Sequence, residues 1–391
     1  MLNTSLSPWP SFTQEEADAV SKVLLSNKVN YWTGTECREF EKEFAAFAGT
    51  QYAVAVANGT LALDVALKAM GIGAGDDVIV TSRTFLASAS CIVTAGANPV
   101  FADVDLNSQN ISAETVKAAL TPNTKAVIVV HLAGMPAEMD GIMDLAKEHD
   151  LWVIEDCAQA HGAKYKGKSV GSIGHVGAWS FCQDKIMTTG GEGGMVTTND
   201  KELWRKMWSY KDHGKSYDAV YHREHAPGFR WLHESFGTNW RMMEMQAVIG
   251  RIQLKRMPEW TARRQAHAAK LAESLGKFAS IRLIEVADYI EHAQYKFYAF
   301  VKPEHLKEGW TRDRIVNELN ARKVPCYQGS CSEVYLEKAF DNTPWRPRER
   351  LKNAVELGDT SLMFLVHPTL TDEEIAFCKE NIEAVLTEAT A

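Results

Sequence analysis

Residues 126–156, AVIVVHLAGMPAEMDGIMDLAKEHDLWVIED, decide the fold class of this 391-residue chain. The segment begins with the apolar run AVIVV, continues through a stretch that predicts a helix, and ends on a second apolar run, LWVIE. Continuous apolar runs are typical of strands that are covered on both faces. Two such strands joined by a helix predict a right-handed crossover and parallel pairing.

The same alternation extends from about residue 50 to residue 200. Apolar runs recur at 78–80 (VIV) and 99–101 (PVF), and LALDVALKAMG at 61–71 predicts another helix. Repeated strand–helix units build an α/β domain around a mostly parallel sheet. We therefore expect the ligand site beyond the carboxyl ends of these strands.

After residue 240 the pattern changes. A long helical region follows, which we expect to be bent or interrupted near Pro258. QYKFYAFV at 294–301 alternates like a half-exposed strand, and Thr311 and Thr371 are expected helix caps, the latter with Glu374 at capping-box spacing. We divide the chain into a large α/β domain, 1–257, and a smaller C-terminal α+β domain, 258–391.

Composition excludes several classes of protein. The net charge of −8 and the lack of basic runs interleaved with aromatics argue against nucleic-acid binding. No stretch approaches the roughly 20 apolar residues of a membrane span, and the first 20 residues do not resemble a signal peptide. Seven scattered cysteines favour free thiols in a cytoplasmic protein, with no metal site.

Two polar segments follow expected strands in the first half of the large domain. Asn58, Gly59 and Thr60 open a helix, where free backbone N–H groups can bind an anion. Taken alone, this motif also fits a plain capped helix start. Phe85 follows the strand at 78–80 and could lie against a planar ring or pack in the core.

Two further segments carry groups suited to catalysis. Asp156 ends a strand, with Gln159 one helical turn later; the carboxylate could cap a helix or hold a proton on a heteroaromatic nitrogen. Lys185, in SFCQDKIMTTGGEGG at 180–194, stands beside four glycines; it could be a surface lysine or form a Schiff base with an aldehyde. Together, an anion cradle, an aromatic ring, a carboxylate and a lysine match what pyridoxal phosphate requires.

The chain resembles the DegT/StrS-type sugar aminotransferases nearly end to end. The resemblance is carried by YWTGTECREFEKEFAAFAG, VANGTLALDVALKAMGIGAGDDVIV, RTFLASASCIVTAGANPVFADVD, VVHLAGMPAEMD, VIEDCAQAHGA, GAWSFCQDKIMTTGGEGGMV, GTNWRMMEMQAVIGRIQL and HPTLTDEEI. It implies the aspartate-aminotransferase fold (fold type I), with pyridoxal 5'-phosphate as cofactor. It also implies roles for matching residues: Lys185 forms the covalent link, Asp156 pairs with the pyridinium nitrogen, Phe85 stacks on the ring, Gly59, Thr60 and Ser180 hold the phosphate, and Gln159 contacts the ring or its hydroxyl.

The resemblance further implies how the protein works and assembles. Asn239, in GTNWR, would reach the phosphate site of a neighbouring subunit, so a homodimer with shared active sites is expected; a helix cap is the alternative for this motif. One branch of the family carries histidine at the lysine position and is a dehydratase, so Lys185 favours transamination. By family habit, glutamate would be the amino donor and a sugar carbonyl the acceptor.

Two segments bear on the acceptor. VPCYQGSCSEVY keeps Tyr327 but lacks the histidine found there in many members of the family. YHREHAPGFRWLH at 221–233 gathers His222, Arg223 and Arg230, which could form an anion-binding substrate loop or a plain solvated loop.

A sugar acid would suit both features. The chain is also similar to transaminases that form 8-amino-3,8-dideoxy-manno-octulosonate, which implies the C8 aldehyde of Kdo as acceptor, in lipopolysaccharide biosynthesis. A nucleotide-linked keto-deoxysugar is the alternative acceptor, and a non-catalytic regulator or scaffold is the alternative of another class. A nicotinamide enzyme is disfavoured, because the glycines of GIGAGDD at 71–77 follow a helix and precede a strand.

Overall fold

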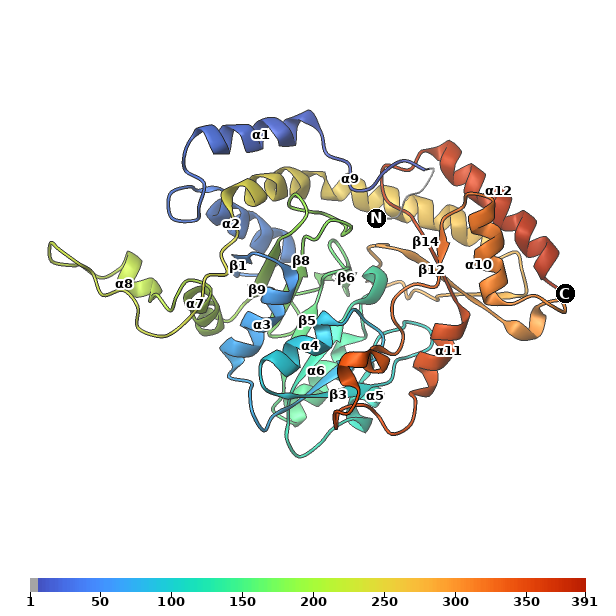
Figure 1. The fold of residues 1–391 in the computed structure, drawn as a ribbon, viewed down its shortest axis with the longest axis horizontal. Coiled ribbons are helices and arrows are strands. Elements are labelled where there is room, and N and C mark those ends of the chain that lie inside the picture. Colours follow the sequence, from blue (N-terminus) through green and yellow to red (C-terminus); the bar gives the residue numbers. More distant parts are fainter. Residues whose placement is uncertain (1–5) are drawn as a thin grey trace.

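The computed structural model describes residues 6–391, and its central layer is a seven-stranded sheet (Figure 1). The strand order is β1-β9-β8-β5-β4-β2-β3. These strands are β1 (Tyr52–Val56), β2 (Asp77–Thr81), β3 (Asn98–Ala102), β4 (Thr124–Val130), β5 (Trp152–Asp156), β8 (Val176–Ser180) and β9 (Gly194–Thr198). Neighbours from β8 to β3 pair in parallel, whereas β9 runs antiparallel to both β1 and β8. The predicted α/β class with a mostly parallel sheet is confirmed.

Helices cover both faces of this sheet. They are α2 (Glu36–Ala48), α3 (Gly59–Met70), α4 (Ala87–Thr94), α5 (Ala113–Ala118), α6 (Met139–Glu148) and α7 (Lys201–Tyr210), whereas α1 (Gln14–Leu25) packs on the long helix described below. Along β4, Ala126 and Ile128 pack in one hydrophobic core with α3, while Val127 and Val129 pack in another with α6. Burial on both faces is the reason for the uninterrupted apolar runs in the sequence.

The C-terminal part is built on a second sheet with the order β10-β12-β14-β13, in which all pairs are antiparallel. Its strands are β10 (Ile281–Leu283), β12 (Phe297–Val301), β13 (Cys326–Tyr327) and β14 (Ser361–Phe364). The helices here are α10 (Arg312–Ala321), α11 (Lys352–Thr360) and α12 (Asp372–Ala389). A small third sheet joins β11 (Ile290–Glu291), β6 (Lys164–Tyr165) and β7 (Lys168–Ser169).

The long helix α9 (Glu244–Leu275) links the two parts of the molecule and is not interrupted at Pro258, where we expected a bend or an interruption. Proline removes one backbone hydrogen bond from a helix interior. The helix nevertheless continues, because it packs against α1 and α2 as well as against α12. Tertiary packing, which supplies most helical stability in proteins, outweighs the local cost.

The expectation of a half-exposed strand at 294–301 is wrong. Every residue of β12 is buried, because a hydrophobic core covers each face of the strand. Tyr298 and Phe300 pack in the core with α6, whereas Phe297, Ala299 and Val301 pack in the core of the C-terminal part. Alternate side chains of β12 therefore enter two different hydrophobic cores, instead of alternating between a core and solvent.

The predicted helix starts are confirmed. Thr371 Oγ1 accepts from the Glu374 N–H at 3.1 Å while Glu374 Oε2 accepts from the Thr371 N–H at 2.8 Å, and Thr311 Oγ1 accepts from the Arg314 N–H. Across residues 6–391, none of the helices combines the length and the apolar character needed to cross a membrane.

Candidate active site

A cleft of about 830 Å³ opens at the carboxyl ends of β5 and β8, between the central sheet and the C-terminal part. It brings together segments that lie far apart in the sequence, from the start of α3 to β14. Seven of the residues predicted to bind the cofactor line it: Gly59, Thr60, Phe85, Asp156, Gln159, Ser180 and Lys185. Asn239 is the one predicted cofactor residue that is not among the lining residues.

One end of the cleft is suited to an anion. Asn58 caps α3 by accepting from the Leu61 N–H at 3.0 Å, which leaves the N–H groups of Gly59 and Thr60 without a partner in the helix. A Cβ atom on Gly59 would lie 2.5 Å from the Ser180 Cβ, so only glycine lets the helix start approach β8 this closely. The hydroxyls of Thr60 and Ser180 line the same cleft. This arrangement fits a phosphate.

Asp156 occupies the floor of the cleft. Its carboxylate is nearly buried and accepts from the Ser88 hydroxyl at 2.8 Å and the Ala158 N–H at 3.1 Å. These two donors orient the carboxylate, and each oxygen keeps a further lone pair for a protonated ring nitrogen. Ser88 was not predicted; it follows Phe85 by three residues at the start of α4, but no signal in the sequence pairs it with Asp156.

Lys185 enters the cleft from the loop after β8. Its Nζ lies 5.4 Å from the centre of the Tyr295 ring, and its carbonyl accepts from the Trp9 indole N–H at 2.9 Å. The Tyr295 hydroxyl donates to Asp184. Partial desolvation raises the pKa of Asp184, but the Lys185 cation and the Tyr295 hydroxyl outweigh it and hold the pKa below its ordinary value. Asp184 therefore stays ionised beside Lys185.

Phe85 and Gln159 complete the cofactor-sized part of the cleft. Phe85 is 70% exposed, although it is a large aromatic residue, and it lines the cleft rather than the core. An apolar ring left in water beside a cavity is suited to cover a planar ligand. Gln159 Oε1 accepts from the Ala133 N–H at 2.8 Å, so its amide N–H groups remain available as donors.

Residues 10–383 match the family model described as the DegT/DnrJ/EryC1/StrS aminotransferase family. The chain belongs to this family. The aminotransferase is similar to an aminotransferase from Psychrobacter cryohalolentis of known structure, with 65% identity, a TM-score of 0.96, and 98% of this chain and 99% of that chain covered.

Two curated relatives show how the family is used. The aminotransferase is 41% identical to GDP-perosamine synthase of Caulobacter vibrioides over 344 residues, which cover 86% of each chain. It is 36% identical to the UDP-N-acetyl-3-dehydro-alpha-D-glucosamine 3-aminotransferase of Acidithiobacillus ferrooxidans, with 91% of this chain and 90% of that one covered. The protein is therefore a sugar aminotransferase that depends on pyridoxal phosphate.

The residues lining the cleft fit this cofactor. The helix start can hold its phosphate, Asp156 can pair with its ring nitrogen, and Lys185 offers the amine that binds its aldehyde. When bound, pyridoxal phosphate supplies an aldehyde that condenses with amines and a ring that accepts the electron pair released at the donor's α-carbon. The protein's own part is to bind, to orient and to move the proton at that carbon.

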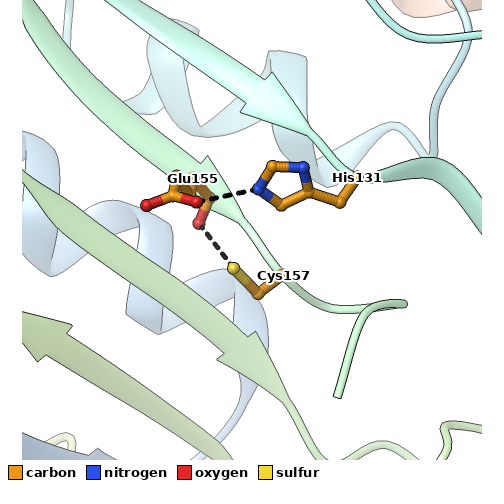
Figure 2. Close-up of side chains that lie close together, drawn as sticks. All are labelled: His131, Glu155 and Cys157. Atoms are coloured by element: carbon orange, nitrogen blue, oxygen red, sulfur yellow. Dashed lines mark hydrogen bonds and ion pairs between the residues drawn. The ribbon is translucent and has the colours of Figure 1, made fainter. Parts of the chain in front are cut away.

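A second polar cluster lies directly behind Asp156. His131, Glu155 and Cys157 are buried together, within reach of a common metal ion (Figure 2). However, the Ala137 N–H donates to His131 Nδ1 at 3.1 Å, so the ring proton is on Nε2, which donates to Glu155 at 2.9 Å. Both nitrogens of His131 are therefore used.

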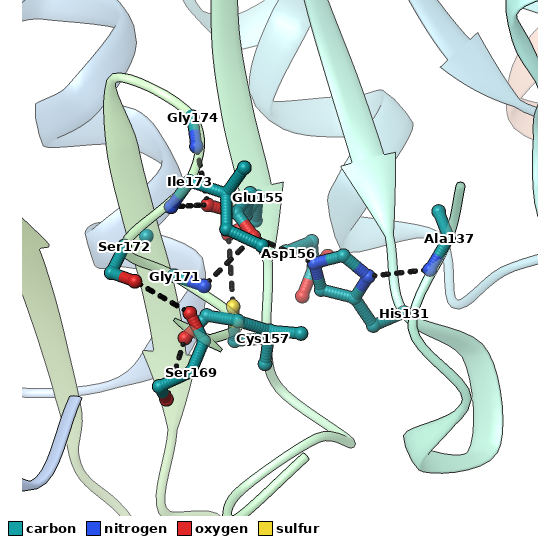
Figure 3. Close-up of polar contacts among 12 residues, drawn as sticks. His131, Ala137, Glu155, Asp156, Cys157, Ser169, Gly171, Ser172, Ile173 and Gly174 are labelled. Carbon is teal, nitrogen blue, oxygen red and sulfur yellow. Dashed lines mark hydrogen bonds and ion pairs between the residues drawn. The ribbon is translucent and has the colours of Figure 1, made fainter. Parts of the chain in front are cut away.

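The remaining groups of this cluster are also committed. Glu155 accepts from the backbone N–H groups of Gly171, Ile173 and Gly174 in addition to His131 (Figure 3). Burial raises the pKa of the Cys157 thiol well above its ordinary value, and Glu155 raises it further. Through Glu155, this cluster holds the 171–174 loop against β5.

The remaining predicted residues lie outside this chain's own cleft. Asn239, His222, Arg223 and Arg230 are exposed on the segment between α7 and α9, where Arg223 pairs with Glu234 at 2.7 Å. Tyr327, on β13, packs near Leu365, Leu370 and Ile375. The cleft is also lined by Tyr295, Lys296 and Tyr298. The sequence did not reveal these residues, because their segment predicted only a strand.

Proposed function

We propose that Lys185 is the residue that binds the cofactor aldehyde and then moves the proton at the donor's α-carbon. Asp156 keeps the ring nitrogen protonated, Phe85 covers the ring, and Gly59, Thr60 and Ser180 hold the phosphate. The observation that carries this assignment is the meeting of Lys185 and Asp156 in one cleft beside the open start of α3. Borohydride reduction of the holoenzyme should label one peptide, which contains Lys185.

For the acceptor, we propose a keto sugar linked to a nucleotide, with glutamate as amino donor. Support comes from the relatives, which include a GDP-perosamine synthase and an aminotransferase named for a UDP-linked 3-dehydro sugar. The proposed enzyme acts in the cytoplasm, and its seven free cysteines are consistent with a reducing compartment.

The C8 aldehyde of Kdo remains a second candidate. One observation favours it: Lys296, an ammonium group without a carboxylate partner within 4.0 Å among residues 6–391, lines the cleft close to Lys185. A free sugar acid would bring a carboxylate to this position. The missing histidine near Tyr327 is a further departure from the pattern of many members.

One assay separates these acceptors. Purified holoenzyme with glutamate is offered a panel of nucleotide-linked 3-keto and 4-keto sugars and, separately, the C8 aldehyde of Kdo. We expect an aminated nucleotide sugar by mass spectrometry and no aminated Kdo. Amination of the Kdo aldehyde alone would reverse the assignment.

We also propose that the active unit is a homodimer with shared sites. The segment around α8 (Tyr217–Tyr221) projects from the body of the molecule (Figure 1), and its Phe229, Trp231 and Phe236 are 76%, 79% and 99% exposed. Large apolar side chains gathered on a projecting segment mark an interaction surface. A second copy would cover them and would receive Asn239 near its phosphate site.

Subunit mixing tests this proposal. Lys185→Ala and Asn239→Ala each disable the site to which they contribute. If the two residues act from different subunits, co-refolded mixtures contain hybrid dimers with one intact site, and activity recovers to about a quarter of wild type. Each variant refolded alone is the control, and a mixture no more active than those controls would contradict shared sites.

A further inference from the structure

Lys296 stands at the junction of two cavities. It directly precedes β12 and lines the cofactor cleft. It also lines a second cavity of about 790 Å³, which Trp9, His367 and the Gly190–Gly191 turn border from the other side. Asp184 is shared by both cavities as well. A ligand in the cleft can therefore extend past Lys296.

Two lysines and three carboxylates, Asp156, Asp184 and Glu192, line the cleft, but Lys296 has no ion-pair partner within residues 6–391. Lys185 and Lys296 are the cationic side chains that line the cleft there, and no carboxylate oxygen lies within 4.0 Å of Lys296 Nζ. Both ammonium groups face the Tyr295 ring, Lys185 at 5.4 Å and Lys296 at 4.8 Å from its centre. Once Lys185 is committed to the cofactor, Lys296 is the cation left to meet a substrate.

A buried guanidinium lies close enough to Lys296 for its charge to act on it. Arg264, on α9, is 1% exposed; its Nη1 donates to the Tyr295 carbonyl, while Nε and Nη2 have no partner among the described residues. The guanidinium lies over the Trp9 ring, 5.0 Å from its centre, and Arg264 is not among the residues that line the two cavities. Asp184, already bonded to Tyr295, is the one carboxylate facing Lys296 across the junction.

From this placement we infer that Lys296 binds a substrate carboxylate next to the reacting carbon. The assignment rests on the proposed function, because it assumes a dicarboxylic donor such as glutamate or an acceptor that carries an acid group. Both substrates occupy the same cleft in turn, so one ammonium group can serve each of them. A lysine that only packs on Tyr295 would have no such role.

The protonation state of Lys296 provides a second measurable property, the pH dependence of carboxylate binding. Desolvation lowers the pKa of Lys296 to about 8, with Arg264 and Lys185 acting in the same direction and Asp184 opposing them. His367, which borders the second cavity, stays neutral because burial lowers its pKa to about 3. Carboxylate binding should therefore weaken as the pH rises above about 8, where Lys296 loses its proton.

The test compares Lys296→Met with Lys296→Arg in the holoenzyme. Lys125→Met is the matched control, because Lys125 is exposed at the start of β4, whereas the cleft lies at the other end of that strand. Glutarate binding is measured by calorimetry, and the change in cofactor absorbance with glutamate or glutamine follows the donor half-reaction without any acceptor. We expect Lys296→Met to weaken glutarate and glutamate binding by about 10- to 100-fold, the worth of a charge-assisted hydrogen bond. Lys296→Arg should stay within a few-fold of wild type and lose the decline above pH 8.

Comparing glutamate, glutamine and an acid-bearing acceptor identifies which substrate carboxylate Lys296 binds. Weakening with glutamate and glutamine alike assigns the donor's α-carboxylate, and weakening with glutamate alone assigns its side-chain carboxylate. An effect confined to an acid-bearing acceptor assigns the acceptor. The inference is overturned if Lys296→Met matches Lys125→Met in glutarate binding, in the donor half-reactions with glutamate and glutamine, and in the amination of an acid-bearing acceptor. Because the donor arm needs no acceptor, failure to aminate a nucleotide sugar would overturn the proposed acceptor and leave this inference standing.

Discussion

Two adjacent carboxylates, Glu155 and Asp156, are used in opposite ways. Successive residues of a strand point to opposite faces of the sheet, so one carboxylate faces the 171–174 loop and the other faces the cleft. Glu155 has two donors on each oxygen, whereas Asp156 has one on each and keeps lone pairs for a ligand. Burial with full hydrogen bonding makes the first structural, and partial satisfaction makes the second available for chemistry.

Replacing Glu155 by glutamine tests this division of roles. Glutamine is nearly isosteric, but its NH₂ group would face backbone N–H donors, which leaves buried groups unsatisfied. We expect the free energy of unfolding to fall by about 2–4 kcal/mol in chemical denaturation. The exposed Glu304→Gln is the control, and equal stabilities of the two variants would show that the network contributes nothing.

At the scale of elements, the start of α3 determines the anion end of the cleft. The helix begins at Gly59 because Asn58 caps it, and Gly59 allows its backbone to lie against Ser180 on β8. The contact depends on two elements that meet only in the folded protein. The sequence indicates the cap, whereas the strand that faces it is decided by the sheet order.

Gly59→Ala should disrupt this contact. The added Cβ would lie 2.5 Å from the Ser180 Cβ and 3.0 Å from its Cα, so the helix start must move away from the strand. We expect a loss of about 1–3 kcal/mol in stability and at least roughly tenfold weaker binding of pyridoxal phosphate, measured by fluorescence titration. Gly73→Ala, whose nearest neighbour would be 3.7 Å away, is the control. Unchanged cofactor affinity in Gly59→Ala would contradict the proposed cradle.

Elements with local signals were predictable, and those decided by their neighbours were not. Thr311 and Thr371 cap helices where expected, because capping acts between residues three apart. The helix is not interrupted at Pro258, and the strand expected to be half-exposed at 294–301 is buried. In both cases the packing partners come from distant segments: α1, α2 and α12 support α9, while two hydrophobic cores cover β12.

For the whole molecule, three buried histidines contribute to the loss of stability in acid. Burial lowers the pKa of His161, His292 and His367 from the ordinary 6.5 to about 3. Between these values the unfolded chain binds protons that the native protein does not, so stability is full above about pH 6.5 and falls as the pH decreases toward 3. Each histidine contributes a slope of about 1.4 kcal/mol per pH unit in that window.

Denaturation of the holoenzyme between pH 7 and pH 5 tests this expectation. His161 lies among the rings of Phe44, Trp179 and Phe181, so His161→Phe keeps an aromatic group there and removes one titrating site. We expect a shallower loss of stability in this variant than in wild type. His305→Gln, at an exposed position, should keep the wild-type slope. Identical slopes in all three proteins would refute the role of His161.

The sequence by itself determined the α/β class, the chain order of the strands and the residues that end them, because hydrophobic patterning and capping act over a few residues. It also indicated Asp156 and Lys185, since each follows an apolar run. Only the tertiary structure decided that Ser88 orients Asp156, that Tyr295 and Lys296 enter the cleft, and that Glu155 is structural. Some of these relations join segments that are more than a hundred residues apart. They exist only once the sheet order and the docking of the C-terminal part have placed those segments side by side.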